Sequence, residues 1–312
     1  MQTITLILFL IGGILCLYLG AELLIIYAAR LAISLGMTPM VVGLTVVAFS
    51  TSTPELASTI IAQLKGDHSN MALGTIIGSN IANIGLILGL ITLIKPLDID
   101  KQVKRFEAPF TIAITGLLWI FMLNHQINLW MGIILLVGIS LYVLKHVVSV
   151  NHASIKTDEL EKISDSNKIL YSFYIILGVA FLTLGGYFLI KGAVGLAARL
   201  GVSDRVIGLT VVALGTSLPE FAASLVAIIR KLGDVAVGNI LGSNVFNILF
   251  ILGIVSIIKP INFTPKFITQ DMPILMGFSV LLWVLVLLQK KMGRLSGVLL
   301  LGSYVGYLFY VA

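Results

Sequence analysis

The sequence predicts an all-α integral membrane protein with ten transmembrane helices. Of its 312 residues, 58% are hydrophobic and 11% are charged, and the mean hydropathy is +1.09. A soluble domain has about 25% charged residues, so this composition excludes a soluble enzyme, a nucleic-acid-binding domain and a disordered chain. Apolar runs long enough to cross a bilayer are separated by short polar breaks. Their expected bounds are 3–29, 39–63, 71–94, 106–123, 127–148, 169–198, 204–229, 235–258, 268–288 and 295–311.

The chain contains two internal repeats of five spans each. Residues 36–61 align with 201–226 with 13 identities in 26 positions. Residues 74–96 align with 238–260 with 13 identities in 23. Repeats of this kind are the first feature to look for in a sequence. The expected organisation is a first five-helix repeat at 1–148, a polar linker at 149–168 and a second five-helix repeat at 169–312.

An odd number of spans per repeat determines the relative orientation of the repeats. The second repeat then starts on the opposite side of the membrane, so we expect two inverted repeats, an architecture of secondary transporters. With the N-terminus outside, the inner loops and helix ends hold fourteen Lys and Arg residues and the outer ones hold five. The positive-inside rule therefore predicts a multi-pass protein of the cell (plasma or inner) membrane, with both termini outside and the linker in the cytoplasm.

Two carboxylates lie deep in apolar segments, Glu55 in the second span and Glu220 in the seventh. A charge at the bilayer centre costs at least about 2.5 kcal/mol, so such residues mark a functional site by default. The alternative is a buried pair that holds helices together. A stabilising pair would need cationic partners, and Lys191 is the single Lys or Arg near the middle of a span.

Each of these acids follows a proline, which removes a backbone donor and clashes with the preceding turn. We therefore expect the helices to be interrupted at residues 50–53 and 215–218. An interruption leaves backbone carbonyls unpaired, notably those of Thr51 and Thr216, and within a bilayer such groups must be buried in protein or line a wet cavity.

The ligands available at the two interruptions are all oxygens. They comprise two carboxylates, several carbonyls and the hydroxyls of Thr51, Ser52, Thr216 and Ser217. Hard cations such as Ca²⁺ take six to eight oxygen ligands, whereas soft metals prefer Cys and His, which these motifs lack. Two carboxylates match the charge of a divalent ion, and their mutual repulsion makes protons natural competitors.

A second motif, G-S-N-x-x-N, occurs at 78–83 and again at 242–247. Its glycines are expected to let spans 3 and 8 approach closely, and its polar side chains recur three to four residues apart, on one helix face. That face holds Ser79, Asn83, Ser243 and Asn247. It could complete an ion site, so helices 2, 3, 7 and 8 are expected to form the ion-binding core. The alternative is a set of hydrogen bonds that joins the helices.

Other charged residues in the spans favour structural roles. Glu22 and Lys191 have no equivalents in the other repeat, which favours a local ion pair or snorkelling to the interface. Glu107 and Asp271 are equivalent and precede helices 4 and 9, which favours capping at the positive end of the helix dipole.

The paired strings S-T-S-T-P-E at 50–55 and G-T-S-L-P-E at 215–220, each followed by G-S-N-x-x-N, resemble the two alpha repeats of the sodium/calcium exchangers. These proteins belong to the cation/calcium antiporter superfamily, and the length resembles compact prokaryotic members. The resemblance implies Na⁺-driven Ca²⁺ antiport by alternating access. Nothing requires a cofactor, because Na⁺ and Ca²⁺ are cargo. The bilayer is the expected environment, and neither a nucleic acid nor an obligatory protein partner is indicated.

The resemblance also implies roles for individual residues. Ca²⁺ would be bound by the Glu55 and Glu220 carboxylates with the carbonyls of Thr51 and Thr216. Na⁺ would be bound by Ser52, Ser217, Ser79, Ser243 and the carbonyls of Ala48 and Ala213. Asn83 and Asn247 would line the central site. Potassium-dependent relatives carry an acid at the position of Asn247, so the resemblance implies transport without K⁺.

Three differences between the two repeats matter here, so the two halves of the site are expected to be unequal, and the resemblance does not fix their relative ion affinities. Ser50 stands where the first motif usually has glycine, Thr53 corresponds to Leu218, and Thr75 corresponds to Asn239. Three rival functions remain open at this point. They are a proton-coupled antiporter of Ca²⁺ or another divalent cation, a passive cation channel and an intramembrane enzyme.

Overall fold

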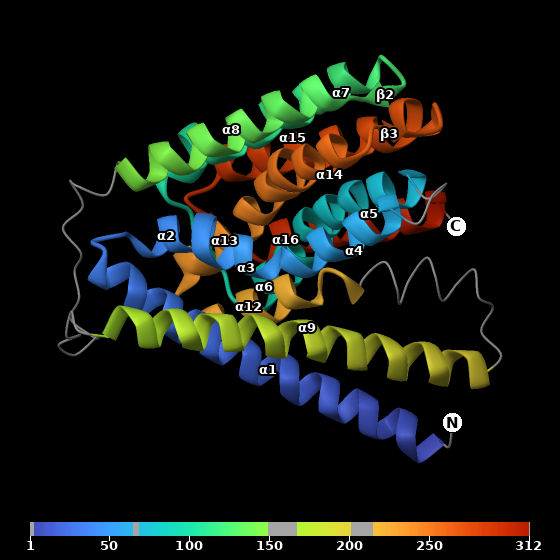
Figure 1. Ribbon diagram of the computed structural model, residues 1–312. Coiled ribbons are helices and arrows are strands. Elements are labelled where there is room, and N and C mark those ends of the chain that lie inside the picture. Colours follow the sequence, from blue (N-terminus) through green and yellow to red (C-terminus); the bar gives the residue numbers. More distant parts are fainter. Residues whose placement is uncertain (1–2, 65–68, 149–166, 201–214, 312) are drawn as a thin grey trace. The chain divides into compact units, whose positions relative to one another are not determined.

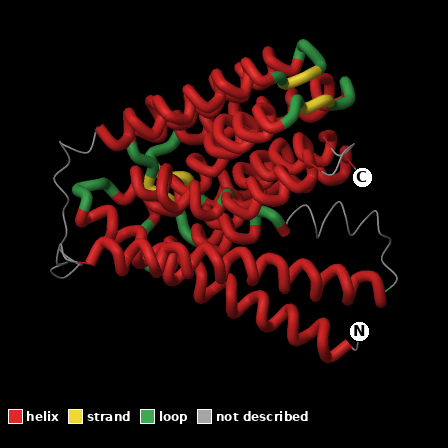
Figure 2. The backbone as a smooth tube through the Cα atoms, in the orientation of Figure 1, coloured by secondary structure: helices red, strands yellow, loops and turns green. Residues whose placement is uncertain are grey.

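The computed structural model describes residues 3–64, 69–148, 167–200 and 215–311, which are almost entirely helical (Figures 1 and 2). This part of the chain forms two compact units, each with segments from both sequence repeats. Unit 1 contains residues up to Thr51 and 144–239, and unit 2 contains 52–143 and 240–311. The units are therefore a different division from the repeats. Most of the expected linker lies outside the described residues.

Unit 1 is built from helices that are far apart in the sequence. In chain order they are α1 (Thr3–Ser34), α2 (Pro39–Val42), the π-helical turn η1 (Gly43–Val47), α3 (Ala48–Thr51), α9 (Lys168–Arg199), α12 (Leu218–Ile229) and the beginning of α13 (Gly233–Val245).

The helices α1 and α9 are repeat equivalents, and they pack side by side over much of their length (Figure 1). Gly13 contacts Gly185, and Gly20 contacts Gly178, so the two helices run antiparallel. A Cβ atom on Gly20 would lie 2.7 Å from the Gly178 carbonyl oxygen, which only glycine permits. Since residues 13 and 20 correspond to 178 and 185, the contacts are reciprocal, as in a pair related by a two-fold axis.

Unit 2 contains most of the remaining elements. They are α4 (Thr53–Leu64), α5 (Ser69–Ala82), η2 (Asn83–Leu88), α6 (Gly89–Ile94), β1 (Leu97–Asp98), η3 (Val103–Glu107), α7 (Ala108–Met122), β2 (Gln126–Ile127), α8 (Leu129–Val148, up to residue 143), the end of α13, η7 (Phe246–Ile251), α14 (Leu252–Ile258), β3 (Ile261–Asn262), η8 (Phe267–Asp271), α15 (Met272–Leu288), β4 (Lys291–Met292) and α16 (Arg294–Val311).

Two short strand pairs join loops of unit 2 (Figure 2). β1 pairs antiparallel with β4, with Leu97 opposite Met292, and β2 pairs antiparallel with β3, with Ile127 opposite Ile261. β1 is the repeat equivalent of β3, and β2 is the equivalent of β4. The two pairings are therefore exchanged copies of each other.

The described residues contain eight helical stretches long and apolar enough to cross a membrane, or nine when the interrupted stretch from Pro39 to Leu64 is included. This confirms an all-helical, multi-span membrane protein. The predicted seventh span, 204–229, is described only from residue 215, where α12 forms its end. The stretches Asn70–Ile94 and Gly233–Ile258 are mostly buried in protein, whereas α1, α8, α9 and α16 are mostly exposed. The third and eighth spans are therefore the most enclosed of these stretches.

Candidate functional site

Both helices that carry the conspicuous acids begin at an interruption, as the sequence predicts. α3 ends at Thr51, Ser52 forms a turn, and α4 begins at Thr53. In the second repeat, residues 216 and 217 form the turn and α12 begins at Leu218. Proline is tolerated in the first turn of a helix, where its missing N–H would have no intrahelical partner. The prolines therefore start new helices and place Glu55 and Glu220 in the first turn of each.

In unit 1, one asparagine joins residues from the two interruptions. The Asn239 side chain is completely buried and accepts a hydrogen bond from Thr51 Oγ1 at 3.1 Å. Its amide nitrogen donates to the Glu220 carbonyl oxygen at 3.2 Å and to Ser224 Oγ at 2.9 Å. Thr51, Glu220 and Ser224 are also completely buried. Ala48 is nearby, because its carbonyl oxygen lies 3.3 Å from Thr51 Oγ1.

In unit 2, Glu55 lies in α4 and is completely buried. Its own carbonyl oxygen accepts hydrogen bonds from Thr59 Oγ1 at 2.6 Å and Ser58 Oγ at 3.0 Å. Ser52, at the interruption, is 3% exposed. Glu55 and Ser52 are thus buried, as Glu220 and Ser217 of the second repeat are, whereas Ala57 and Ser58 on the other side of α4 are exposed.

Four asparagines in the G-S-N-x-x-N motifs form two reciprocal pairs inside unit 2. Asn83 Nδ2 donates to Asn244 Oδ1, and Asn247 Nδ2 donates to Asn80 Oδ1, each at 3.0 Å. Asn247 Nδ2 also lies 3.3 Å from Ser79 Oγ. All four asparagines are completely buried. Within the described chain, the Oδ1 atoms of Asn83 and Asn247 have no hydrogen-bond donor, so each pair leaves one amide oxygen that can bind a cation.

The remaining predicted site residues are placed as follows. Ser79, Ser243 and Ser217 are buried, Ala48 is completely buried, and Thr216 lies half-buried in the turn before α12. Ala213 lies outside the described residues. Among the described residues there is no cluster of three or more His, Cys, Asp or Glu side chains that could hold a metal ion. Any cation site here therefore depends on amide, hydroxyl and carbonyl oxygens beside the two glutamates.

Sequence reasoning missed two features of this region. The first is the π-helical turns η2 and η7, which occur at equivalent positions and contain Asn83 and Asn247. Such turns are frequent at functional sites, but the sequence carries no recognisable signal for them. The second is the role of Asn239 as a bridge, for which the only signal was its difference from Thr75.

The expected close approach at the G-S-N glycines is wrong for Gly78. A Cβ atom there would meet nothing within 4 Å. Gly85 in η2 makes a close contact with other helices, because its Cβ would lie 2.7 Å from Phe278 of α15 and 2.9 Å from Tyr304 of α16. The motif glycine at 78 is thus not needed for helix contact.

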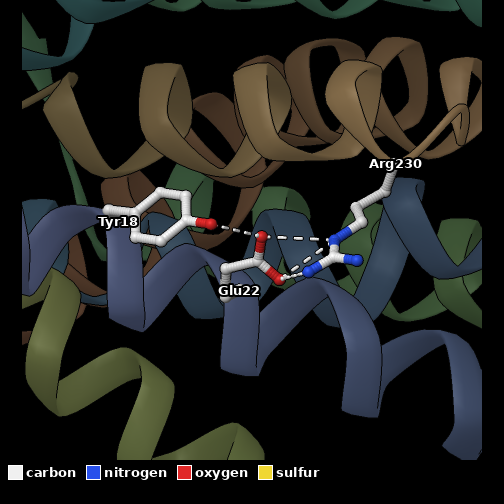
Figure 3. Close-up of polar contacts among 3 residues, drawn as sticks. All are labelled: Tyr18, Glu22 and Arg230. Atoms are coloured by element: carbon white, nitrogen blue, oxygen red, sulfur yellow. Dashed lines mark hydrogen bonds and ion pairs between the residues drawn. The ribbon is translucent and has the colours of Figure 1, made fainter.

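Glu22 forms an ion pair within unit 1, one of the two expected structural roles (Figure 3). Arg230 Nη2 lies 2.7 Å from Glu22 Oε2, Arg230 Nε contacts both carboxylate oxygens, and the Tyr18 hydroxyl donates to Oε1 at 3.1 Å. The hydrogen bond with Glu22 raises the pKa of Arg230. Lys191 has a different environment, 4.7 Å from the ring centre of Phe9, a cation–π contact.

The expected capping by Glu107 and Asp271 is wrong, because neither side chain makes a capping hydrogen bond. Glu107 is 1% exposed. Its carboxylate accepts hydrogen bonds from Gln102 Nε2 at 2.8 Å and from the Tyr142 hydroxyl at 2.9 Å. The helix also continues through Glu107 from η3 into α7, so its N-terminus lies too far upstream for a cap.

Comparison with known proteins identifies one family, and the match covers both halves of the chain. The family model described as sodium/calcium exchanger protein matches residues 5–148 and 170–312. The inner membrane protein YrbG of Escherichia coli is 32% identical over 96% of this chain and 94% of its own length. The sodium/calcium exchanger MaX1 of Methanosarcina acetivorans is 28% identical over 97% of this chain and 98% of its own length.

Among solved structures, the sodium–calcium exchanger NCX_Mj, soaked with zero Na⁺ and Ca²⁺, matches with a TM-score of 0.84 and 28% sequence identity. The match covers 100% of both chains. A family model matched on both repeats and a full-length structural match leave one conclusion about identity. The chain belongs to the sodium/calcium exchanger family, and it is a membrane transporter, not an enzyme.

Proposed function

We propose that this protein exchanges Na⁺ for Ca²⁺ across the membrane by alternating access. One observation carries the proposal: Glu55 and Glu220, equivalent in the two repeats, are each completely buried in the first turn of a helix that begins at an interruption. Carboxylate oxygens are ligands that hard cations such as Ca²⁺ prefer. A transported divalent cation would neutralise two such groups at once.

The residue roles are part of the proposal. Glu55 and Glu220, with the carbonyls of Thr51 and Thr216, hold Ca²⁺. Na⁺ is held by Ser52, Ser217, Ser79, Ser243 and the carbonyls of Ala48 and Ala213. Asn83 and Asn247 line the central site. Their unpaired amide oxygens support this assignment, because hard cations prefer oxygen ligands.

Competition between the two ions for the same oxygens would couple their transport. An unoccupied site leaves buried negative charge without its compensating ion, which disfavours the conformational change. Occupation by one Ca²⁺ or by several Na⁺ removes that charge and permits the site to open on the other side. No cofactor is needed, because the Na⁺ gradient supplies the free energy.

We also propose ten spans in two inverted repeats, in the cell membrane, with both termini outside and the 149–168 linker in the cytoplasm. The antiparallel packing of the equivalent helices α1 and α9 supports the inversion. The strand pairs support the same membrane topology. It places the loops of β1 and β4 on the inner side and those of β2 and β3 on the outer side.

Transport is expected to be independent of K⁺. The chain has Asn247 where potassium-dependent relatives carry an acid, and Asn247 pairs with Asn80 through its amide nitrogen, a bond that an aspartate could not donate. Replacing K⁺ by an organic cation on both sides of the membrane should leave the exchange rate unchanged. A rate that requires K⁺ would refute this part of the proposal.

The test is Ca²⁺ uptake into proteoliposomes loaded with Na⁺ and diluted into Na⁺-free buffer, measured at two clamped pH gradients. Glu55→Gln and Glu220→Gln should abolish uptake while the protein remains folded. Glu22→Gln is the matched control. It also removes an acid from an apolar helix, but that acid is already paired with Arg230.

Each outcome separates the candidate functions. Uptake that needs internal Na⁺ and ignores the pH gradient supports Na⁺/Ca²⁺ exchange. Uptake that follows the pH gradient without Na⁺ supports a proton-coupled antiporter of Ca²⁺ or another divalent cation. Flux that needs no counter-ion supports a channel. Normal uptake in both Glu→Gln variants would refute the assignment of the carboxylates.

A further inference from the structure

Asn239 lies near the start of α13, and its counterpart in the first repeat is Thr75. Neither of the two repeated motifs includes it. It is completely buried and makes three side-chain hydrogen bonds inside unit 1, to Thr51, Glu220 and Ser224. Two of these residues carry proposed Ca²⁺ ligands, and they come from different repeats.

The chemistry of its partners fixes the orientation of the Asn239 amide. A backbone carbonyl oxygen can only accept a hydrogen bond, so the NH₂ group must face Glu220. The amide oxygen then faces the Thr51 hydroxyl, which can donate. A rotated amide would place two acceptors against each other and would lose this bond in a region without solvent. The side chain therefore has one position that satisfies all its partners.

The backbone geometry around Asn239 is equally constrained. A Cβ atom on Gly43 would lie 2.4 Å from the Val235 carbonyl oxygen and 3.0 Å from the Asn239 nitrogen. A Cβ atom on Gly238 would lie 2.6 Å from the Met40 carbonyl oxygen. The start of α13 thus packs directly on the segment that leads to Thr51. This close contact holds the Asn239 side chain within reach of the interruption.

The first repeat does not reproduce this arrangement. The Thr75 hydroxyl donates to the Met71 carbonyl oxygen of its own helix, at 2.9 Å. Threonine commonly makes this bond to the residue four positions earlier, and its side chain has no amide to reach a second helix. The polar support that Asn239 gives to the second acidic motif therefore has no equivalent at position 75.

We propose that Asn239 is a positioning residue for cation binding, which fixes the backbone at Glu220 and the hydroxyl of Thr51. This inference rests on the proposed function. The difference between Asn239 and Thr75 then makes the second acidic motif the better ordered of the two, and it makes the affinity of the whole site depend on this amide. Asn239 itself needs no contact with the ion.

The deciding variant is Asn239→Thr, which installs the residue that the first repeat has naturally. Ser224→Ala is the matched control, because it removes a buried hydrogen bond to the same amide but leaves the bonds to Thr51 and Glu220 in place. Thr51→Val removes the hydroxyl that donates to the Asn239 amide oxygen and keeps the Thr51 carbonyl. Two Ca²⁺ concentrations are measured. The first half-saturates transport, and the second gives half of the maximal rise in unfolding temperature in detergent.

We expect Asn239→Thr to raise both Ca²⁺ concentrations about tenfold, since the loss of a buried hydrogen bond of this kind changes an equilibrium by about that factor. Ser224→Ala should change them less than about twofold. In the double variant with Thr51→Val, the effects should be less than additive, as for residues that share one interaction. The loss of buried hydrogen bonds should also lower the unfolding temperature without ions, so stabilisation by Ca²⁺ is measured in each variant relative to its own ion-free unfolding temperature.

Three results would overturn the inference. They are unchanged Ca²⁺ concentrations in Asn239→Thr, equal changes in Asn239→Thr and Ser224→Ala, and fully additive effects with Thr51→Val. If Asn239→Thr does not fold, the Thr51→Val variant is the test. Unchanged Ca²⁺ concentrations in that variant would then overturn the inference. Failure of the proposed function can be distinguished from failure of this inference, because the wild-type protein itself would then show no Na⁺-driven uptake. Thermal stabilisation by Ca²⁺ would still test the role of Asn239.

Discussion

Unit 1 contains two glutamates in apolar segments, and they differ in almost every physical respect. The Glu22 side chain is 13% exposed and pairs with Arg230, whose side chain is 49% exposed (Figure 3). Glu220 is completely buried, starts a helix after an interruption, and has its backbone carbonyl bonded to Asn239. An acid in an apolar segment is therefore not by itself evidence of an ion site. Its neighbours and its burial decide between a structural role and a functional one.

The correspondence between the two repeats also distinguishes Glu220 from Glu22, without any structural information. Glu220 has an equivalent acid, Glu55, whereas the equivalent of Glu22 is Tyr187. A site formed by two related halves needs its charged ligands in both, but a local ion pair does not. Glu107 shows where this criterion fails, because it corresponds to Asp271 and is nevertheless engaged by Tyr142 and Gln102.

The largest expected effect separates Glu220 from Glu22. Glu220→Gln should lower Na⁺-driven Ca²⁺ uptake on the order of 100-fold or more, because truncating one member of a buried charged set costs about 3–5 kcal/mol. Glu22→Gln should retain uptake within about twofold, since its carboxylate is bonded to Arg230 and surface pairs contribute little. Uptake per folded molecule measures both. Equal losses in the two variants would contradict the distinction.

The next effect concerns Glu107, a buried acid with a structural role. Glu107→Leu leaves the buried Tyr142 hydroxyl without its acceptor, and we expect it to lower the free energy of unfolding by about 1–3 kcal/mol. Glu107→Gln keeps an acceptor for Tyr142 and should cost less. Thermal unfolding in detergent measures this, with uptake per folded molecule unchanged. Lost uptake at an unchanged unfolding temperature would place Glu107 in the ion path.

Much of the fold follows from the sequence, because the bilayer imposes strong constraints. Helix positions follow from the length of each apolar run, and the two interruptions follow from Pro54 and Pro219, which cannot donate a backbone hydrogen bond. The π-helical turns could not be predicted. No residue pattern in the sequence marks them, and the close contact of Gly85 in η2 with Phe278 and Tyr304 is a tertiary property that the sequence does not show either.

The candidate site was less predictable than the spans. The sequence identifies the oxygen-bearing residues, but it does not say which asparagine bonds which. The reciprocal pairs, Asn83 with Asn244 and Asn247 with Asn80, depend on contacts between residues more than 160 positions apart. The Asn239 bridge is similar, since the sequence shows only its difference from Thr75. Capping by Glu107 failed because its helix extends further upstream than its proline suggests.

The smallest effect concerns the ion pair itself. Arg230→Gln should lower the unfolding temperature by about 2 °C or less, because half of the arginine side chain is exposed and exposed pairs are weak. The reduction should shrink further at high salt, which screens exposed charges. The exchanged variant Glu22→Arg with Arg230→Glu should recover part of the loss, as it keeps two opposite charges in contact. If the exchanged variant is less stable than either single variant, the carboxylate and the guanidinium do not act as a pair, and Glu22 would then require the same functional explanation as Glu220.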